Sequence, residues 1–167
     1  MQQNEEVNLH QILKQRIEDW LDAEGITSEP VPDFNSHFHV KSNLKNIEVH
    51  LSEPKVRRGV LAVQAVVSLN EDQLAKISEI KAENRRAIFL DLFSKLDRSE
   101  YLFMLQEDFT SKSWLRIQRA LYIEDLTRTG LLSEMKSHNM KFVNINYELN
   151  LALEGIVTPT GDKTIYT

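Results

Sequence analysis

The sequence predicts an α+β domain in which helices pack against one antiparallel sheet, in the order helix, three strands, helix, two strands, helix. Three observations predict this fold. Apolar residues recur at three- and four-residue steps in separate segments, which is the spacing of one face of an α-helix. Between these segments apolar and polar residues alternate, which is typical of strands with one buried face. Polar turns separate the strands, so consecutive strands are expected to form hairpins.

The first helix is predicted from a stripe of apolar residues at helical spacing: Leu9, Ile12, Leu13, Ile17, Trp20 and Leu21. Gly25 follows and is expected to end the helix, because glycine readily adopts the left-handed backbone conformation found there. Pro30 and Pro32 are unfavourable in a helix and in a central strand. Residues 27–33 are therefore expected to form a connecting loop.

Alternation then predicts a hairpin, with a polar turn at residues 42–46. In its predicted register Phe38 lies opposite Leu51 and Val40 lies opposite Val49, because this pairing keeps both apolar sets on one face.

Residues 60–69 are apolar at nearly every position, which predicts a central strand covered on both sides. Asn70 and Gln73 have the spacing of a capping box, and a single helix is predicted from there to about residue 96. The second half of this helix is apolar almost all round, which is typical of a segment that is buried or lies in an interface.

A second hairpin is predicted from residues 101–106 and 114–123, with a turn at 108–113. Its register pairs Phe103 with Ile117 and Leu105 with Leu115. Arg119 then falls on the apolar face, where it must snorkel or pair with a carboxylate, for which Glu124 or Asp125 is available.

The last segment has two interpretations. The odd positions from 143 to 153 are apolar, which is a strand pattern, but a longer stripe alternates four- and three-residue steps: Leu131, Met135, His138, Phe142, Ile145, Leu149 and Ala152. The stripe begins where Thr127 can cap, which favours one helix over about 126–153. Four asparagines lower its helix propensity and make a break near Asn139 the alternative. Residues 1–154 are therefore expected to form one domain, with 155–167 as a flexible tail.

Composition excludes several classes of function. The 41% hydrophobic and 27% charged residues are ordinary for a globular chain, and no apolar run is longer than a strand, so no membrane association is expected. No apolar leader opens the chain, and we expect a cytoplasmic protein. There is no cysteine, which excludes disulfides and thiolate chemistry. The net charge of −5 argues against nucleic acid as a partner.

No catalytic residue is assigned from the sequence. It contains no GxSxG, HExxH or P-loop motif, and its five glycines form no phosphate cradle. No cofactor is expected, and an enzymatic site would have to be assembled from distant parts.

Histidines on the first hairpin are the candidate metal ligands. His37 and His39 are expected on the outward face of one strand, with His50 opposite His39 and Glu48 beside His50. Two histidines two residues apart, with a third across the hairpin, are able to hold zinc. The alternative is that these are solvent-facing positions that happen to be histidine.

A homodimer interface is predicted at the apolar end of the second helix and on the second hairpin, where aromatic residues and arginine gather. Its candidate residues are Ile88, Phe89, Leu92, Phe93, Trp114, Arg116, Arg119 and Tyr122. The alternative is that these side chains simply form the core.

The element order resembles that of class I type III secretion chaperones and of YbjN-type domains. Four segments resemble, more specifically, an uncharacterised and mainly archaeal prokaryotic family with that fold: residues 17–25 (IEDWLDAEG), 38–40 (FHV), 86–92 (RAIFLDL) and 117–132 (IQRALYIEDLTRTGLL). The resemblance implies a helical last segment and a homodimer. It also implies a non-catalytic module that binds a protein or peptide. None of the four segments is a catalytic motif, so the resemblance concerns the fold rather than an activity. The alternatives are a metal-dependent protein or enzyme that uses the histidine face, and a structural or regulatory homodimer.

Overall fold

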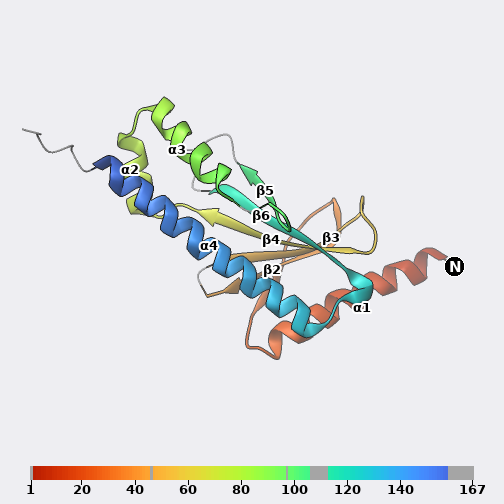
Figure 1. The fold of residues 1–167 in the computed structure, drawn as a ribbon. Helices are drawn as coiled ribbons and strands as arrows, with labels where there is room; N and C mark the ends of the chain where they lie inside the picture. The colour runs from red at the N-terminus through yellow and green to blue at the C-terminus, as the bar shows by residue number, and fades with distance from the viewer. Residues whose placement is uncertain (1, 46, 97, 106–112, 158–167) are drawn as a thin grey trace, which may run out of the picture.

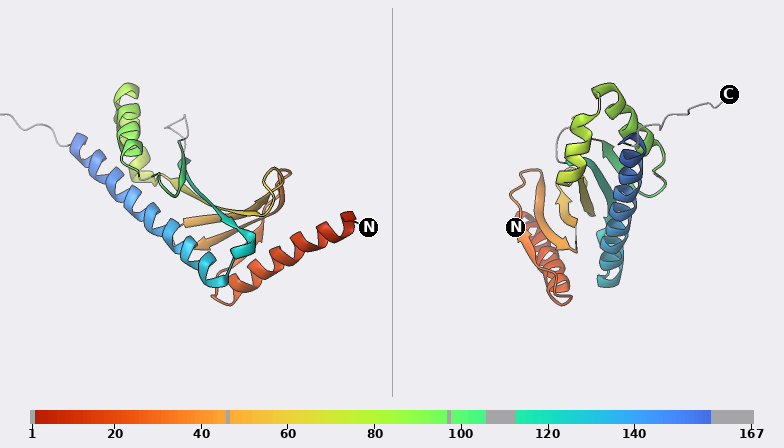
Figure 2. Two further views of the ribbon diagram at one scale, coloured as in Figure 1. Left: turned by 45° about the vertical axis from the view of Figure 1, so that its right-hand side comes forward. Right: turned by 90° about the vertical axis from the view of Figure 1, so that its left-hand side faces the viewer.

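The chain folds into a six-stranded antiparallel sheet with helices packed on one face (Figures 1 and 2). The structure, a computed structural model, describes residues 2–45, 47–96, 98–105 and 113–157. The helices are α1 (Gln2–Asp22), α2 (Glu71–Glu79), α3 (Ala82–Ser94) and α4 (Arg128–Val157), with a short 3-10 helix at Ile123–Asp125. The strands are β1 (Ser28–Pro30), β2 (Ser36–Leu44), β3 (Ile47–Pro54), β4 (Val60–Ser68), β5 (Leu102–Leu105) and β6 (Ser113–Tyr122). Their order across the sheet is β1-β2-β3-β4-β6-β5.

The end of α1 follows the prediction, but the segment after it does not. Gly25 has φ +70° and ends the helix. The predicted loop at 27–33 contains the edge strand β1, whose Pro30 pairs with Val40 of β2. A proline is tolerated on an edge strand because its missing N–H is not needed on the free side. The sheet therefore has six strands rather than five.

The predicted register of the first hairpin is wrong by two residues. Val40 lies opposite Leu51, and Phe38 lies opposite Glu53. The strands continue to the pair Leu44 and Ile47, which replaces the predicted turn at 42–46 with a tight one that begins at Lys45 (φ 57°). A two-residue shift leaves every side chain on its original face, so the hydrophobic pattern does not distinguish the two registers.

The core consists of two clusters on the helix-covered face of the sheet. One cluster joins α1 and the start of α4 to β2, β3 and β4, and the other joins α2, α3 and the rest of α4 to β4, β5 and β6. Phe142 packs against both. The opposite face of the sheet carries no helix among the described residues (Figure 2). On that face of β4, Val60 and Ala62 are still buried, whereas the later positions are only partly buried, so the prediction of a strand covered on both sides is confirmed for its first half only.

The predicted long helix after β4 is two helices. The capping box is confirmed, with Asn70 accepting from the Gln73 backbone N–H at 2.8 Å and Gln73 accepting from the Asn70 backbone N–H at 3.0 Å. However, α2 ends at Ile80, which is extended (ψ 136°), and α3 begins after Lys81 (ψ 142°). Burial of Ile80 in the core (8% exposed) accounts for the break, since the chain must turn there to place α3 over the sheet.

The last segment is a continuous helix, as the stripe and the resemblance predicted. The Thr127 hydroxyl accepts a hydrogen bond from the Gly130 N–H at 3.1 Å and so caps α4. The helix continues through Asn139 and runs past the expected end of the domain to Val157. No described helix has both the length and the apolar character required to cross a membrane.

Arg119 pairs with a carboxylate as expected, but with a different one. Its guanidinium donates to Glu134 of α4 at 2.8 Å, not to Glu124 or Asp125. Glu134 is 6% exposed, and His138 Nδ1 lies 3.1 Å from its other carboxylate oxygen. Burial alone would raise the pKa of Glu134, but interactions with His138 and Tyr101 and the charge of Arg119 outweigh it and lower that pKa below 4.5.

Replacement of Glu134 with glutamine should destabilise the protein at pH 7 by about 1–2 kcal/mol, because Arg119 loses its buried anionic partner. Because the pKa of Glu134 is lowered in the folded protein, the unfolded chain binds more protons than the folded one just below pH 4.5. The stabilisation is therefore lost as the pH falls through that range. Urea unfolding should therefore show a larger difference between wild type and Glu134→Gln at pH 7 than at pH 3.

Glu100→Gln is the matched control, since Glu100 lies 3.6 Å from the same guanidinium but is 63% exposed. It should change stability little at either pH. An equal loss at both pH values for Glu134→Gln would contradict a role for the charge.

Candidate binding site

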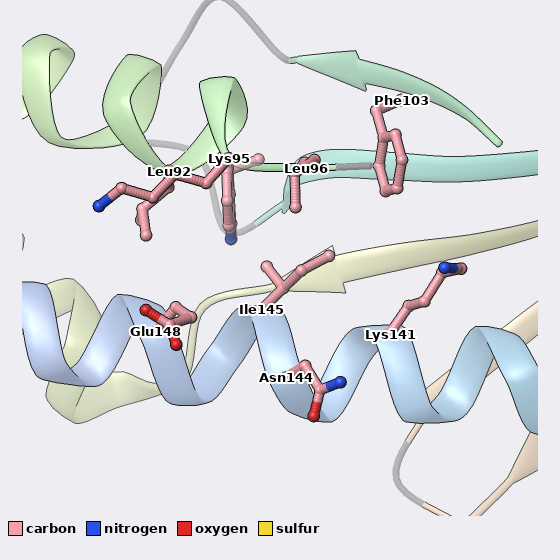
Figure 3. Close-up of a pocket in the computed structure, with 9 residues that line it drawn as sticks. Leu92, Lys95, Leu96, Phe103, Lys141, Asn144, Ile145 and Glu148 are labelled. Atoms are coloured by element: carbon pink, nitrogen blue, oxygen red, sulfur yellow. The ribbon is translucent and has the colours of Figure 1, made fainter. Parts of the chain in front are cut away.

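A cavity of about 400 Å³ lies between α3, α4 and the second hairpin (Figure 3). Its apolar walls come from three parts of the chain: Leu92, Leu96, Phe103, Trp114 and Ile145. Figure 3 shows Leu92, Lys95 and Leu96 facing α4 across the open space. The break between α2 and α3 contributes to this arrangement, because it lets α3 lie over the sheet at its own angle to α4. Cavities of this size commonly hold a ligand or a partner side chain.

Charged and polar side chains surround the cavity. Lys95 forms an ion pair with Asp91 at 2.7 Å, and the hydrogen bond and charge of Asp91 raise the pKa of Lys95. The Lys141 ammonium lies 4.1 Å from the centroid of the Tyr101 ring. Asn144 and Glu148 of α4 complete the lining. The lining thus contains two lysines, a glutamate and an asparagine, but no histidine, serine, threonine or cysteine.

The predicted interface residues do not form one surface. Phe89, Leu92 and Trp114 are buried within the chain, and the Phe89 and Trp114 rings pack 4.8 Å apart. The remaining five are at least partly accessible: Ile88, Phe93, Arg116, Arg119 and Tyr122. For the three buried residues the core alternative is the correct one, although Leu92 and Trp114 also line the cavity.

A β-bulge explains the position of Trp114. Val67 pairs with Leu115, but Ser68 pairs with Ser113, so Trp114 is the extra residue on β6. Its side chain packs against α3, whereas Arg116, two residues on, is exposed. The alternation that predicted a shared face is interrupted at the bulge.

Three of the four candidate metal ligands contact one another in a line rather than around one point. The His39 Nε2 atom lies 2.9 Å from His50 Nδ1, and His50 Nε2 lies 2.9 Å from a Glu48 carboxylate oxygen. His50 is opposite Lys41 rather than His39, so the two histidines meet diagonally across the hairpin. Asp33, which the sequence did not identify, lies 3.3 Å from His39 Nδ1 without hydrogen-bond alignment.

His37 lies apart from this chain of contacts. A bulge between Ser36 and Phe38 changes the direction of its side chain, which stacks on His10 of α1 with ring centroids 3.7 Å apart. His10 in turn contacts Glu53 at 2.7 Å. Among the residues that the structure describes, no three or more histidine or carboxylate side chains are grouped as a metal ion requires.

His39 has a lowered pKa. Burial of the ring is the largest cause, and the neighbouring His50 lowers the pKa further, while the carboxylate of Asp33 opposes both effects. The unfolded chain therefore binds more protons than the folded one just below pH 6.5. It follows that protonation of His39 destabilises the fold as the pH falls through this range.

We expect wild type to lose more stability than His39→Gln between pH 7.5 and about pH 5, since the variant lacks the ring that resists protonation. Urea midpoints measured across this range test the difference. Asp33→Asn should enlarge the loss, because it removes the anion that favours protonated His39. The pKa of His37 is also lowered, but His37 is present in all three proteins, so it adds the same pH-dependent loss of stability to each. Parallel pH curves for wild type and His39→Gln would contradict this assignment.

The chain is therefore an α+β domain with one antiparallel sheet, helices on one face and a partly apolar cavity between two of the helices and the second hairpin. The chain matches the family described as "Uncharacterized conserved protein (DUF2299)" over residues 13–146, and it belongs to that family. The predicted resemblance to an uncharacterised prokaryotic family is thereby confirmed. The search of curated proteins found no match.

Solved structures resemble the chain at low sequence identity. An uncharacterized protein from Methanothermobacter thermautotrophicus has a TM-score of 0.66 at 19% identity, with 86% of this chain and 97% of that protein covered. The Yersinia pestis type III secretion chaperone SycH, in complex with a fragment of YscM2, has a TM-score of 0.49 at 15% identity, covering 80% of this chain and 98% of that one. The HopA1-SchA chaperone-effector complex gives 0.48 at 13% identity, covering 78% and 90%.

Proposed function

We propose that this protein is a non-catalytic module that binds another protein or a peptide, with the cavity between α3, α4 and β5 as the docking site. The observation that supports this most directly is the combination of apolar walls with charged side chains around them. Leu92, Phe103 and Ile145 offer a place for an apolar anchor, and burial of such anchors provides most of the affinity in protein interfaces. The lining contains two lysines, Lys95 and Lys141, but one glutamate, Glu148, so its charge favours an anchor residue that is flanked by acidic groups.

The neighbouring strand supports an extended partner. β5 is last in the strand order, so one of its edges lacks a neighbouring strand among the described residues. Leu102 on this strand is 57% exposed, while Phe103 forms part of the cavity wall. A peptide added to a sheet edge gains main-chain hydrogen bonds and places alternate side chains on each face. Such a peptide would run beside the cavity and would place an anchor residue in it.

Lys95→Trp tests the cavity, because a bulky side chain at this exposed position should close its mouth without changing the core. Tagged protein is used to recover partners from the native host, with quantitative mass spectrometry. We expect wild type to recover a partner at fixed stoichiometry and Lys95→Trp to reduce that recovery at least tenfold.

Lys81→Trp is the matched control, because Lys81 is an exposed lysine at the opposite end of α3 and does not line the cavity. It should recover the partner as well as wild type does. Equal recovery by Lys95→Trp, or no reproducible partner under several conditions, would count against the proposal.

Metal binding is the second candidate, favoured by the 2.9 Å contact between His39 and His50. If these two rings hold zinc, adding zinc should raise the melting temperature of the wild type but not that of His50→Gln. His37→Gln should respond like wild type, since His37 lies against α1 instead. An unchanged melting temperature would leave the histidine contacts as a structural feature of the hairpin.

A further inference from the structure

The C-terminal half of α4 carries a second apolar stripe on the side of the helix that faces away from the core. Its members are Met140 (58% exposed), Val143 (45%), Tyr147 (60%) and Leu151 (46%). Steps of three, four and four residues place them along one line of the helix. The core residues Ile145 and Leu149 lie two residues from Tyr147, which is about 200° around the helix. The exposed stripe is therefore directly opposite the buried one.

This exposed stripe has no role within the described fold. In both views of Figure 2, no described helix or strand lies over the side of α4 away from the sheet. Other exposed apolar side chains, such as Phe34 and Val56, lie singly in turns, and such isolated residues are normal. Four apolar side chains in a continuous line over three turns form a patch, and such patches mark interaction sites.

We infer that this stripe packs against the same stripe of a second copy of the chain, with the two α4 helices antiparallel. In an antiparallel pair, residues face each other when their numbers add to a constant. Val143 with Tyr147 gives 290, and Met140 with Leu151 gives 291, so one register brings all four apolar residues to within one residue of apolar partners. A parallel arrangement about a two-fold axis would instead place each residue beside its own copy.

The charges at the ends of the stripe fit the same register. Lys136 precedes the stripe and Glu154 follows it, both on the exposed side of α4, and their numbers also add to 290. Each end of the antiparallel pair therefore brings a lysine of one copy beside a glutamate of the other. Further towards the start of α4, the exposed positions Ser133 and Thr129 are polar, which limits the contact to the C-terminal half.

The contact is expected to be weak and concentration-dependent. Stable interfaces usually bury about 1,200 Å² or more in total, and a single pair of helices with four apolar residues each is at the low end. Sedimentation over a range of concentrations should show a dimer that forms at micromolar concentrations and above. This inference rests on the outer side of α4 and does not depend on the cavity or on any partner bound there.

The absence of cysteine from the sequence allows a direct test of the register. Met140→Cys and Leu151→Cys are prepared separately and treated with a bis-maleimide that spans on the order of 10 Å, close to the spacing of packed helices. Each variant alone should stay largely uncross-linked, because identical positions lie about 16 Å apart along the helices. The mixture should give a covalent dimer. Cross-linking of each variant alone, or none in the mixture, would overturn the proposed register.

Charge variants test whether a second copy of the chain covers the stripe. Tyr147→Lys should weaken the dimer at least tenfold, whereas Val56→Lys, at an exposed apolar position outside α4, should not. Lys136→Glu and Glu154→Lys should each weaken the dimer severalfold, and the double exchange should restore it, since the two charges then meet again in reversed positions. Circular dichroism spectra and melting curves confirm that each variant is folded. A wild type that remains monomeric at several hundred micromolar would refute self-association.

Discussion

Burial of one side of α4 against the sheet is the constraint on which the rest of the structure depends. The helix has 30 residues and is about 45 Å long, and it supplies side chains to both core clusters. Leu131 packs with α1 and the first hairpin, Leu149 packs with α2, α3 and the second hairpin, and Phe142 touches both groups. The pair of Arg119 and Glu134 fixes the rotation of the helix, because a turn by one residue (about 100°) would leave the buried carboxylate without its cation.

Features of the fold that depend on local sequence were predictable, and those that depend on distant contacts were not. The capping box at Asn70 agrees with the structure, since neighbouring residues specify it, and the pairing of Phe103 with Ile117 agrees as well. The register of the first hairpin was not predictable from the hydrophobic pattern, because a two-residue shift moves no side chain to the other face of the sheet. The break after Ile80 has no glycine or proline to signal it, and results from burial of that side chain against the sheet.

The candidate sites were predicted less well than the fold, and β-bulges account for much of the difference. Alternation places side chains correctly only while the strand is regular, and both His37 and Trp114 lie where a strand has an extra residue. His39 and His50 lie on regular stretches and do meet, although diagonally. The cavity was not predicted, because it combines Lys95, Phe103 and Glu148 from elements whose relative placement no local pattern specifies. The only feature of the sequence that pointed towards the cavity was the apolar second half of the predicted helix, which is α3 in the structure.

The strand-like pattern of residues 143–153 has a physical explanation in the two-sided character of α4. All of its odd positions are apolar, but they are apolar for two reasons that alternate along the chain. Ile145, Leu149 and Leu153 are buried in the core, whereas the intervening Val143, Tyr147 and Leu151 are exposed on the other side. Two four-residue helical stripes offset by two residues produce a period of two, because two residues correspond to about 200° of a helix. Period two within a long helical segment therefore indicates a helix with two apolar sides, of which a single domain buries only one.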